Sequence, residues 1–381
     1  IQEYAKAPGM GMLDSTICDI YLVNERGGIV GRPILTVCID AYSSLCCGYS
    51  LSWEGGMYSL RQLMLNVITD KQELCQKHGI NINRQEWDSS MCPGVLVTDQ
   101  GTEYMSSCFE QITELGVKVI NLPVYRPELK GNVEKFFSII QDLFRPYLKG
   151  KGVIMPDFQE RGAHDYRKDA CLTLQQFEKV LIRCILYYNS QRIIENFPYT
   201  DDMLQAKIPP HANDIFKYGM KLEGVSLIKM DKRQLMLVLL PRTTGKFKRN
   251  GLIVNNVRYK NTNYAEEYLS GGEVEVAYNP DDSSFVWLVD KGNFVEFELI
   301  ESRYRNKKFS EIEVMQSRKK KVIKSVEGEN IQAKINLANH IETIVSNVNR
   351  SSGNLSEIPD NFEREKRKTH IDCMKEGGLN E

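Results

Sequence analysis

The sequence predicts an α/β protein: a mixed sheet flanked by helices, followed by a small β-barrel, a C-terminal helix and a tail. Three β-branched, apolar segments near the start are separated by short turns, which favours an antiparallel meander. Helical and strand patterns then alternate, as they do in a sheet covered by helices. Beyond residue 231, short β segments and turn residues recur closely, which is typical of a small barrel.

The first half of the chain, residues 1–205, is expected to form one α/β domain. Runs of β-branched and apolar residues bounded by turn residues predict strands, at 12–23, 33–42, 45–53, 94–98 and 117–121. Apolar residues spaced about one helical turn apart predict helices, at 58–78, 105–115, 133–148 and 173–190. Residues 149–170, rich in Gly, Lys and Asp, are expected to form a loop.

The second half changes character. Residues 206–230, which contain Pro209 and Pro210, are predicted to be a linker. A barrel is predicted over 231–300, from β segments at 235–240, 252–260, 273–278, 285–289 and 294–299. Turns are expected between and within these segments, at Gly245, Asn255-Asn256, Gly271-Gly272, Pro280 to Asp282 and Lys291 to Asn293. A basic and polar helix is predicted over 301–345, and a flexible tail over 346–381.

Composition excludes several classes of protein. A chain of 381 residues suggests two or three domains, and 42% hydrophobic residues can bury their cores. The net charge of −1 means that any binding of nucleic acid must come from local basic patches. Ten cysteines and five histidines lack the spacing of a zinc site or a disulfide framework. We expect a reducing cytoplasm and no membrane span. Because the first residue is Ile, we also expect that an upstream region is missing.

Three carboxylates carry the functional prediction. Asp14 lies in the first predicted strand, Asp99 ends a short strand, and Glu134 opens a helical pattern 35 residues after Asp99. Only the tertiary fold can bring these three acids together, and a cluster of acids requires a cation. A pair of divalent metal ions satisfies such a cluster, and it is the usual machinery for in-line displacement at phosphorus.

These residues resemble the superfamily of DDE transposases and retroviral integrases, whose core has the ribonuclease-H-like fold. The resemblance is greatest to TnsB-type transposases, with phage Mu transposase as a more distant relative. It rests on LDSTICDIYLVNERGGIVGRPILTVCIDAYSSLCCGYSL, on VTDQGTEY and on PVYRPELKGNVEKFF, and the 35-residue interval matches the family's spacing. Further on, GLIVNNVRY, GGEVEVAYNPDD and FVWLVDKGNFVE resemble the small barrel of Mu-like transposases.

The resemblance implies a DNA transposase that cleaves the 3′ ends of a transposon and joins each 3′-hydroxyl to target DNA. It implies two Mg²⁺ ions as cofactors, for which Mn²⁺ is expected to substitute. Asp14 is expected to bridge both ions, while Asp99 and Glu134 each bind one. A retroviral-type integrase or a ribonuclease-H-like nuclease is an alternative, and a catalytically inactive DNA-binding scaffold is another.

Asp19 competes with Asp14 for the role of first metal ligand. Two strand residues five apart face opposite ways, so only one of them can serve. The family pattern, an apolar residue before the Asp and then a small residue and Thr, aligns with Asp14. Asp19 is then expected to be a solvated or salt-bridged residue, and Asp40 to make a turn-capping hydrogen bond.

Basic and polar residues near the acids and further along the chain are candidate DNA contacts, because such side chains bind phosphates. As isolated surface charges they would carry no function. The candidates are Arg126, Lys130, Asn132, Lys135, Lys246, Lys248, Arg249, Arg318, Lys319, Lys320 and Lys321.

The partners implied by the resemblance are transposon-end DNA, target DNA and further copies of the chain. An AAA+ ATPase regulator is expected to bind the C-terminal tail. Many relatives also work with a separate endonuclease that cuts the 5′ strand. The expected location is the bacterial cytoplasm, on DNA, with no membrane partner.

Overall fold

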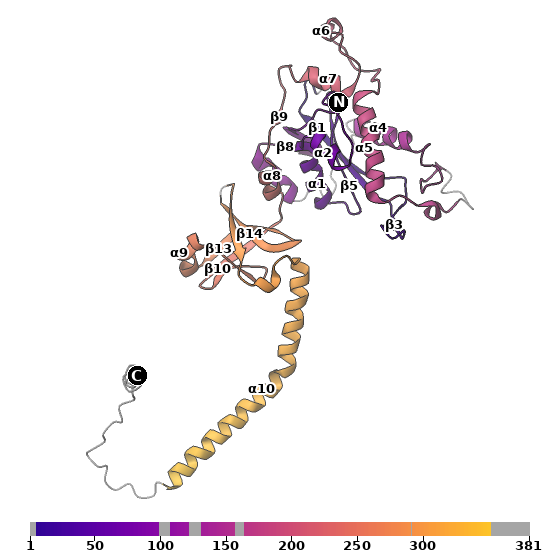
Figure 1. Ribbon diagram of the computed structural model, residues 1–381. Helices are drawn as coiled ribbons and strands as arrows, with labels where there is room; N and C mark the ends of the chain where they lie inside the picture. The colour runs from indigo at the N-terminus through magenta and orange to yellow at the C-terminus, as the bar shows by residue number, and fades with distance from the viewer. Residues whose placement is uncertain (1–4, 99–106, 122–130, 157–163, 291, 352–381) are drawn as a thin grey trace, which may run out of the picture. The chain divides into compact units, whose positions relative to one another are not determined.

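The first unit of the chain, Ile1–Phe309, is built around a mixed five-stranded sheet (Figure 1). The computed structural model describes residues 5–98, 107–121, 131–156, 164–290 and 292–351. The second unit, Ser310–Glu381, contains most of a long helix. No helix in the described part of the chain is long and apolar enough to cross a membrane.

The central sheet has the strand order β5-β4-β1-β7-β8. Its strands are β1 (Met10–Ile17), β4 (Ile34–Asp40), β5 (Cys46–Ser52), β7 (Val95–Thr98) and β8 (Lys118–Asn121). β4 runs antiparallel to its neighbours β1 and β5, whereas β7 and β8 run parallel to β1. The predicted mixed sheet is therefore confirmed, and its topology is that of the expected ribonuclease-H-like core.

Helices cover both faces of this sheet. They are α1 (Met57–Ile68), α2 (Lys71–Lys77), α4 (Gly131–Phe144) and α5 (Leu174–Ser190). Thr36 on β4 shares a 2.6 Å hydrogen bond with Ser59 of α1. Tyr49, which lies opposite Val37 in the register, donates a 3.0 Å hydrogen bond to Glu178 of α5. Because neighbouring strand residues point to opposite faces, α1 and α5 lie on opposite sides of the sheet.

Two predicted elements of the core are wrong in detail. Residues 12–23 do not form one strand, since β1 ends at Ile17 and a separate β2 (Leu22–Val23) pairs with β3 (Ile29–Gly31). Residues 58–78 form two helices, because the side chain of Asp70 accepts hydrogen bonds from the backbone N–H groups of Gln72 and Glu73 and so starts α2.

Shorter elements connect the core. They are α3 (Ser107–Glu110), the 3₁₀ turns η1 (Gln111–Leu115) and η4 (Tyr166–Asp169), β6 (Cys92–Pro93), α6 (Asp201–Gln205), α7 (Ala212–Gly219) and β9 (Leu227–Ile228). β6 pairs with β9. The stretch 206–230, expected to be a linker, thus contains α7, whose Ile215 and Phe216 are buried in the main core.

Residues 235–240, predicted to be a strand, belong largely to a helix, α8 (Lys232–Val238). The side chain of Asp231 accepts a 3.0 Å hydrogen bond from the backbone N–H of Gln234 and caps this helix. Leu235 and Val238, three positions apart, are buried. A short apolar run without alternation fits either a strand or a buried helix, and here the cap starts a helix.

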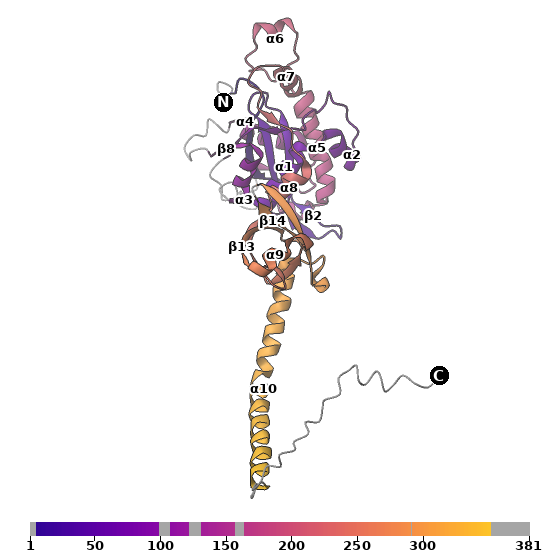
Figure 2. The same ribbon diagram turned by 90° about the vertical axis from the view of Figure 1, so that its left-hand side faces the viewer.

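Six strands then close into a barrel, as predicted, and Figure 2 shows them as a ring. They are β10 (Arg242–Lys248), β11 (Gly251–Val254), β12 (Val257–Lys260), β13 (Gly272–Asn279), β14 (Asp282–Asp290) and β15 (Asn293–Leu299). The turn expected at Gly245 is wrong, because Gly245 lies within β10. Asn255 and Asn256 form the expected turn between β11 and β12, both with positive φ.

Three short helical elements accompany the barrel: η5 (Thr262–Tyr264), α9 (Ala265–Ser270) and η6 (Ser302–Tyr304). The predicted polar helix corresponds to α10 (Phe309–Ser351). It begins later than the predicted start at residue 301, and it continues into residues 346–351, which were predicted to belong to the tail. Every side chain from residue 317 to residue 346 is exposed. The remainder of the predicted tail, 352–381, lies outside the described residues.

Candidate active site

Asp14 lies on the central strand β1, where the sheet register fixes the direction of its side chain. It is paired with Val37 of β4, which is paired in turn with Tyr49 of β5. Residues directly opposite each other in antiparallel strands point to the same face, and Tyr49 reaches Glu178 on α5. Asp14 is half-buried, and its Oδ1 accepts a 2.9 Å hydrogen bond from the backbone N–H of Ser15. Asp14 therefore belongs to the face of the sheet that α5 covers.

Glu134 lies in the first turn of α4 and is exposed. α4 packs against β1, β4 and α5, so it covers the same face of the sheet. Its buried residues are Val133, Phe136, Phe137, Ile140 and Phe144. Since this apolar stripe is buried, the side chain of Glu134 is left facing outward from the packed side of the helix. The structure thus brings Asp14 and Glu134 to one side of the sheet.

Asp99 lies outside the described residues, as do the candidate DNA contacts Arg126 and Lys130. The strand that leads to Asp99 is described. β7 runs parallel to β1, with Val97 beside Met12, and ends at Thr98. The hydroxyl of Thr98 donates a 2.6 Å hydrogen bond to Asn121 at the end of β8. In the described part of the chain, no three His, Cys, Asp or Glu side chains form a group that could hold a metal ion.

Asp19 is held by two arginines. Its carboxylate lies 2.7 Å from Nη2 of Arg32 and 3.6 Å from Nη2 of Arg145. It follows the end of β1, so the strand alternation expected to separate it from Asp14 does not apply. The expected salt bridge is confirmed. A carboxylate that two guanidinium groups neutralise is a poor ligand for a divalent cation.

Asp40 is fully buried and has the turn-capping role expected of it. Its Oδ1 accepts a hydrogen bond from the backbone N–H of Gly9, and its Oδ2 accepts bonds from the backbone N–H and the hydroxyl of Ser43. Burial raises the pKa of Asp40, although these hydrogen bonds oppose the shift. The residue ends β4 and closes the turn toward β5.

Asn132 and Lys135, two of the candidate DNA contacts, line a cavity of about 240 Å³ beside Glu134. Sequence reasoning missed the other walls, which come from Ser44, from Tyr188 and Arg192 at the end of α5, and from residues 193–196. The guanidinium of Arg192 lies 4.8 Å from the centre of the Tyr188 ring. Three segments distant in sequence meet here, so no local motif could have predicted the cavity.

The remaining candidate DNA contacts lie on or beside β10 of the barrel and on α10. Lys246 is on β10 and pairs with Glu273 of β13 at 2.7 Å. This hydrogen bond raises the pKa of Lys246, which therefore stays charged. Lys248 and Arg249 are exposed at the end of β10. The last four, Arg318, Lys319, Lys320 and Lys321, are exposed on α10.

Comparison with known proteins finds similarity in both the core and the barrel. Residues 12–150 match the family model of the TnsB C-terminal domain, and residues 236–296 match that of the Mu transposase C-terminal domain. The chain is 32% identical over 234 residues to the transposon Tn7 transposition protein TnsB of Escherichia coli. It is 25% identical over 299 residues to the transposase for transposon Tn552 of Staphylococcus aureus.

The coverage of these relatives is partial. The match to the Tn7 protein covers 60% of this chain and 33% of that protein, and the match to the Tn552 transposase covers 77% and 54%. The catalytic core domain of BIV integrase superposes with a TM-score of 0.32 and 14% identity, over 56% of this chain and 95% of that one. So low a score carries no argument, and the resemblance rests on the sequence matches. By those matches, the core is similar to the TnsB C-terminal domain and the barrel to the Mu transposase C-terminal domain.

Proposed function

We propose that this chain cleaves the 3′ ends of a transposon and joins each freed 3′-hydroxyl to target DNA. The observation that carries the proposal is the shared face of Asp14 and Glu134. Asp14 points to the side of the sheet that α5 covers, and α4, which bears Glu134, packs on β1 and β4 beside α5. Two acids that are far apart in the sequence thus come from elements on one side of the sheet.

Asp99 is the proposed third acid of this site. The residue follows Thr98 directly in the chain, and consecutive Cα atoms are about 3.8 Å apart. Thr98 ends β7, the parallel neighbour of β1. The described strand that leads to Asp99 is therefore the direct neighbour of the strand that carries Asp14. Asp19, the competing acid, is already neutralised by Arg32 and Arg145.

The donor set fits Mg²⁺, which prefers carboxylate oxygens and keeps several waters. Bound between Asp14, Asp99 and Glu134, a pair of Mg²⁺ ions would polarise the attacking hydroxyl and stabilise the leaving oxygen of an in-line displacement. Mn²⁺, which also takes oxygen ligands, is proposed to substitute. The hydrogen bond from the Ser15 N–H orients the Asp14 carboxylate, and the buried stripe of α4 fixes the direction of Glu134.

The proposed partners follow from this reaction. The substrates are transposon-end DNA and target DNA, and two ends must be joined together, which calls for several copies of the chain. We further propose that an AAA+ ATPase regulator binds residues 346–381 and that a separate endonuclease cuts the 5′ strand. These events take place on DNA in the bacterial cytoplasm.

Strand joining tests the proposal. Pre-cleaved end DNA, a target plasmid and Mg²⁺ are mixed with wild type, Asp14→Asn, Asp99→Asn or Glu134→Gln, and joined products are counted on a gel. Each of these variants should lose joining by a factor of at least 10³, because a neutral amide cannot replace a metal-binding carboxylate. Asp19→Asn is the matched control and should still join.

DNA binding and thermal unfolding of each variant are measured in parallel, so that a misfolded variant is recognised. Joining that survives in Asp14→Asn but not in Asp19→Asn would assign the first ligand to Asp19. Firm DNA binding without joining by wild type would favour the inactive scaffold. Cutting of RNA–DNA hybrids without joining would favour a ribonuclease-H-like nuclease, and joining confined to long terminal repeat ends would favour a retroviral-type integrase.

A further inference from the structure

The cavity between the start of α4 and the end of α5 is walled by hydrogen-bond donors. Lys135 contributes an ammonium and Arg192 a guanidinium, and neither group can accept a hydrogen bond. Nδ2 of Asn132 is buried and, alone among the cavity-lining side chains that the structure describes, is a buried polar atom without a hydrogen-bond partner. A buried donor that lacks an acceptor is costly to the fold, so its retention points to a ligand that supplies one.

Arg192 is held in place before any ligand arrives. Its backbone N–H donates to the carbonyl of Tyr187, and its carbonyl oxygen lies 3.2 Å from Nδ1 of His211. Its guanidinium lies over Tyr188. The buried ring of Tyr188 packs edge-on against Phe136 of α4, with ring centres 4.8 Å apart. The same contact thus fixes Arg192 relative to the helix that carries Asn132 and Lys135.

Charge and size define the ligand that fits. Lys135 and Arg192 are cationic, whereas Glu195 carries the only negative charge in the described lining. Glu195 and Lys135 are both exposed, so water and salt screen both charges, whereas Arg192 is half-buried and its charge is screened less. At roughly 30 Å³ per water molecule, the cavity holds on the order of eight waters, which is ample for a phosphate group with part of its sugar. A small anion rich in acceptor oxygens therefore matches the walls.

We propose that this cavity binds a backbone phosphodiester of the DNA strand that passes the acidic residues. The inference rests on the proposed function, because Asn132 and Lys135 flank Glu134 within a single turn of α4, whose pitch is about 5.4 Å. Lys135 and Arg192 neutralise the phosphate, and Nδ2 of Asn132 donates a hydrogen bond to one of its oxygens. The cavity thereby positions the strand one or more nucleotides from the bond that reacts.

The test compares Arg192→Gln with Lys179→Gln, which removes an exposed cation from α5. Lys179 lies roughly 20 Å from Arg192, at about 1.5 Å per helical residue. Binding of a fluorescent DNA duplex is followed by anisotropy over a series of salt concentrations. Each lost phosphate contact should make the slope of log K against log salt shallower by about 0.9. We expect that change for Arg192→Gln and the wild-type slope for Lys179→Gln.

The variant Asn132→Leu tests whether the side chain of Asn132 serves DNA binding or the stability of the fold. Because the substitution removes an unpartnered buried donor, the thermal midpoint should stay the same or rise while DNA binding weakens several-fold. Glu195→Gln should strengthen binding, since it removes the opposing charge. A lower thermal midpoint of Asn132→Leu, with DNA binding intact, would mean that Asn132 serves the fold and would overturn its assignment.

Duplexes with one neutral methylphosphonate at successive positions locate the phosphate. At one position, the methylphosphonate should weaken DNA binding by wild type but should not weaken DNA binding by Arg192→Gln any further. Identical profiles for the two proteins, together with an unchanged salt slope, would overturn the phosphate site while leaving the proposed function intact. Failure of wild type to bind any duplex would overturn both.

Discussion

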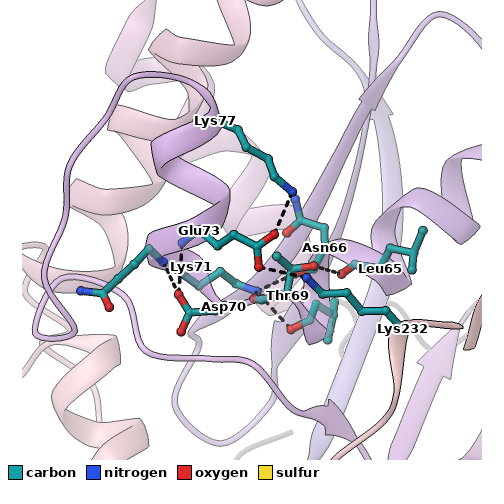
Figure 3. A network of polar contacts seen from close by, with 10 residues as sticks. Leu65, Asn66, Thr69, Asp70, Lys71, Glu73, Lys77 and Lys232 are labelled. Atoms are coloured by element: carbon teal, nitrogen blue, oxygen red, sulfur yellow. Dashed lines mark hydrogen bonds and ion pairs between the residues drawn. The ribbon is translucent and has the colours of Figure 1, made fainter.

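Lys71 carries an ammonium group that is buried at the junction of α1 and α2 (Figure 3). Its Nζ donates hydrogen bonds to the carbonyl oxygens of Asn66, Val67 and Thr69, at 2.6, 3.1 and 3.0 Å. The last carbonyls of a helix have no N–H partner within the helix, and a positive charge there also interacts favourably with the helix dipole. Lys71 therefore caps the C-terminal end of α1.

Burial lowers the pKa of Lys71 from 10.5 to about 8. In the unfolded chain the pKa lies near 10.4, so between about pH 8 and pH 10.4 the unfolded state binds more protons than the folded state. Stability must then rise with pH in this window. Relative to its value at low pH, the contribution of Lys71 should grow little by pH 8 and by roughly 2 kcal/mol by pH 10.

Urea unfolding of wild type and Lys71→Met at pH 7, 8, 9 and 10, in the presence of a reductant, measures this contribution. Other groups change stability in the same range. Burial raises the pKa of Cys18 and Cys92 to about 12, so both proteins lose stability as these thiols ionise in the unfolded chain. That loss is shared and cancels in the difference between the two proteins.

The free energy of unfolding of wild type minus that of Lys71→Met should therefore increase by about 2 kcal/mol between pH 7 and pH 10. Lys179→Met, at an exposed position on α5, is the control and should show no such trend. A difference that stays constant with pH, or falls, would mean that the buried ammonium keeps an ordinary pKa and would refute the reasoning.

Two further substitutions test how the core is held together. In Gly94→Ala the new Cβ would lie 2.9 Å from the carbonyl oxygen of Ser226, so unfolding should become easier by about 1–3 kcal/mol. Gly55→Ala, whose Cβ would meet only a side-chain atom at 3.6 Å, should change stability far less, and equal losses in urea unfolding would contradict the clash. Thr173 and Gln176 form a reciprocal capping box at the start of α5. In thermal unfolding, Thr173→Ala should lower the stability by about 1 kcal/mol and Thr173→Ser by much less. Equal losses of stability in the two variants would exclude a role for the hydroxyl.

The sheet was predictable because its strands are bounded by strong turn residues. β4, β5, β7 and β8 lie within one residue of, or inside, their predicted ranges. Two of the failures occurred where a capping aspartate starts a helix. The sequence predicts a strand over residues 235–240, yet the cap at Asp231 starts a helix there. Similarly, Asp70 divides one long helical pattern into α1 and α2. In both cases a single capping aspartate decided the outcome.

The candidate site was only partly accessible to sequence reasoning. The acids could be named because each lies in a recognisable local pattern. Strand alternation does not separate Asp14 from Asp19, because Asp19 lies beyond the end of β1. The tertiary structure adds another reason against Asp19, the two arginines that hold its carboxylate. Arg192 could not be found from the sequence, because its role depends on Tyr188 and on the start of α4, more than fifty residues earlier.

α4 links the packing of the core to its chemistry. One stripe of the helix, including Val133 and Phe136, is buried and so sets the rotation of the helix about its axis. With successive residues about 100° apart around the axis, that rotation simultaneously directs Glu134 outward and turns Asn132 and Lys135 toward the cavity. A change in the buried stripe must therefore move the proposed metal ligand and the proposed phosphate contacts together.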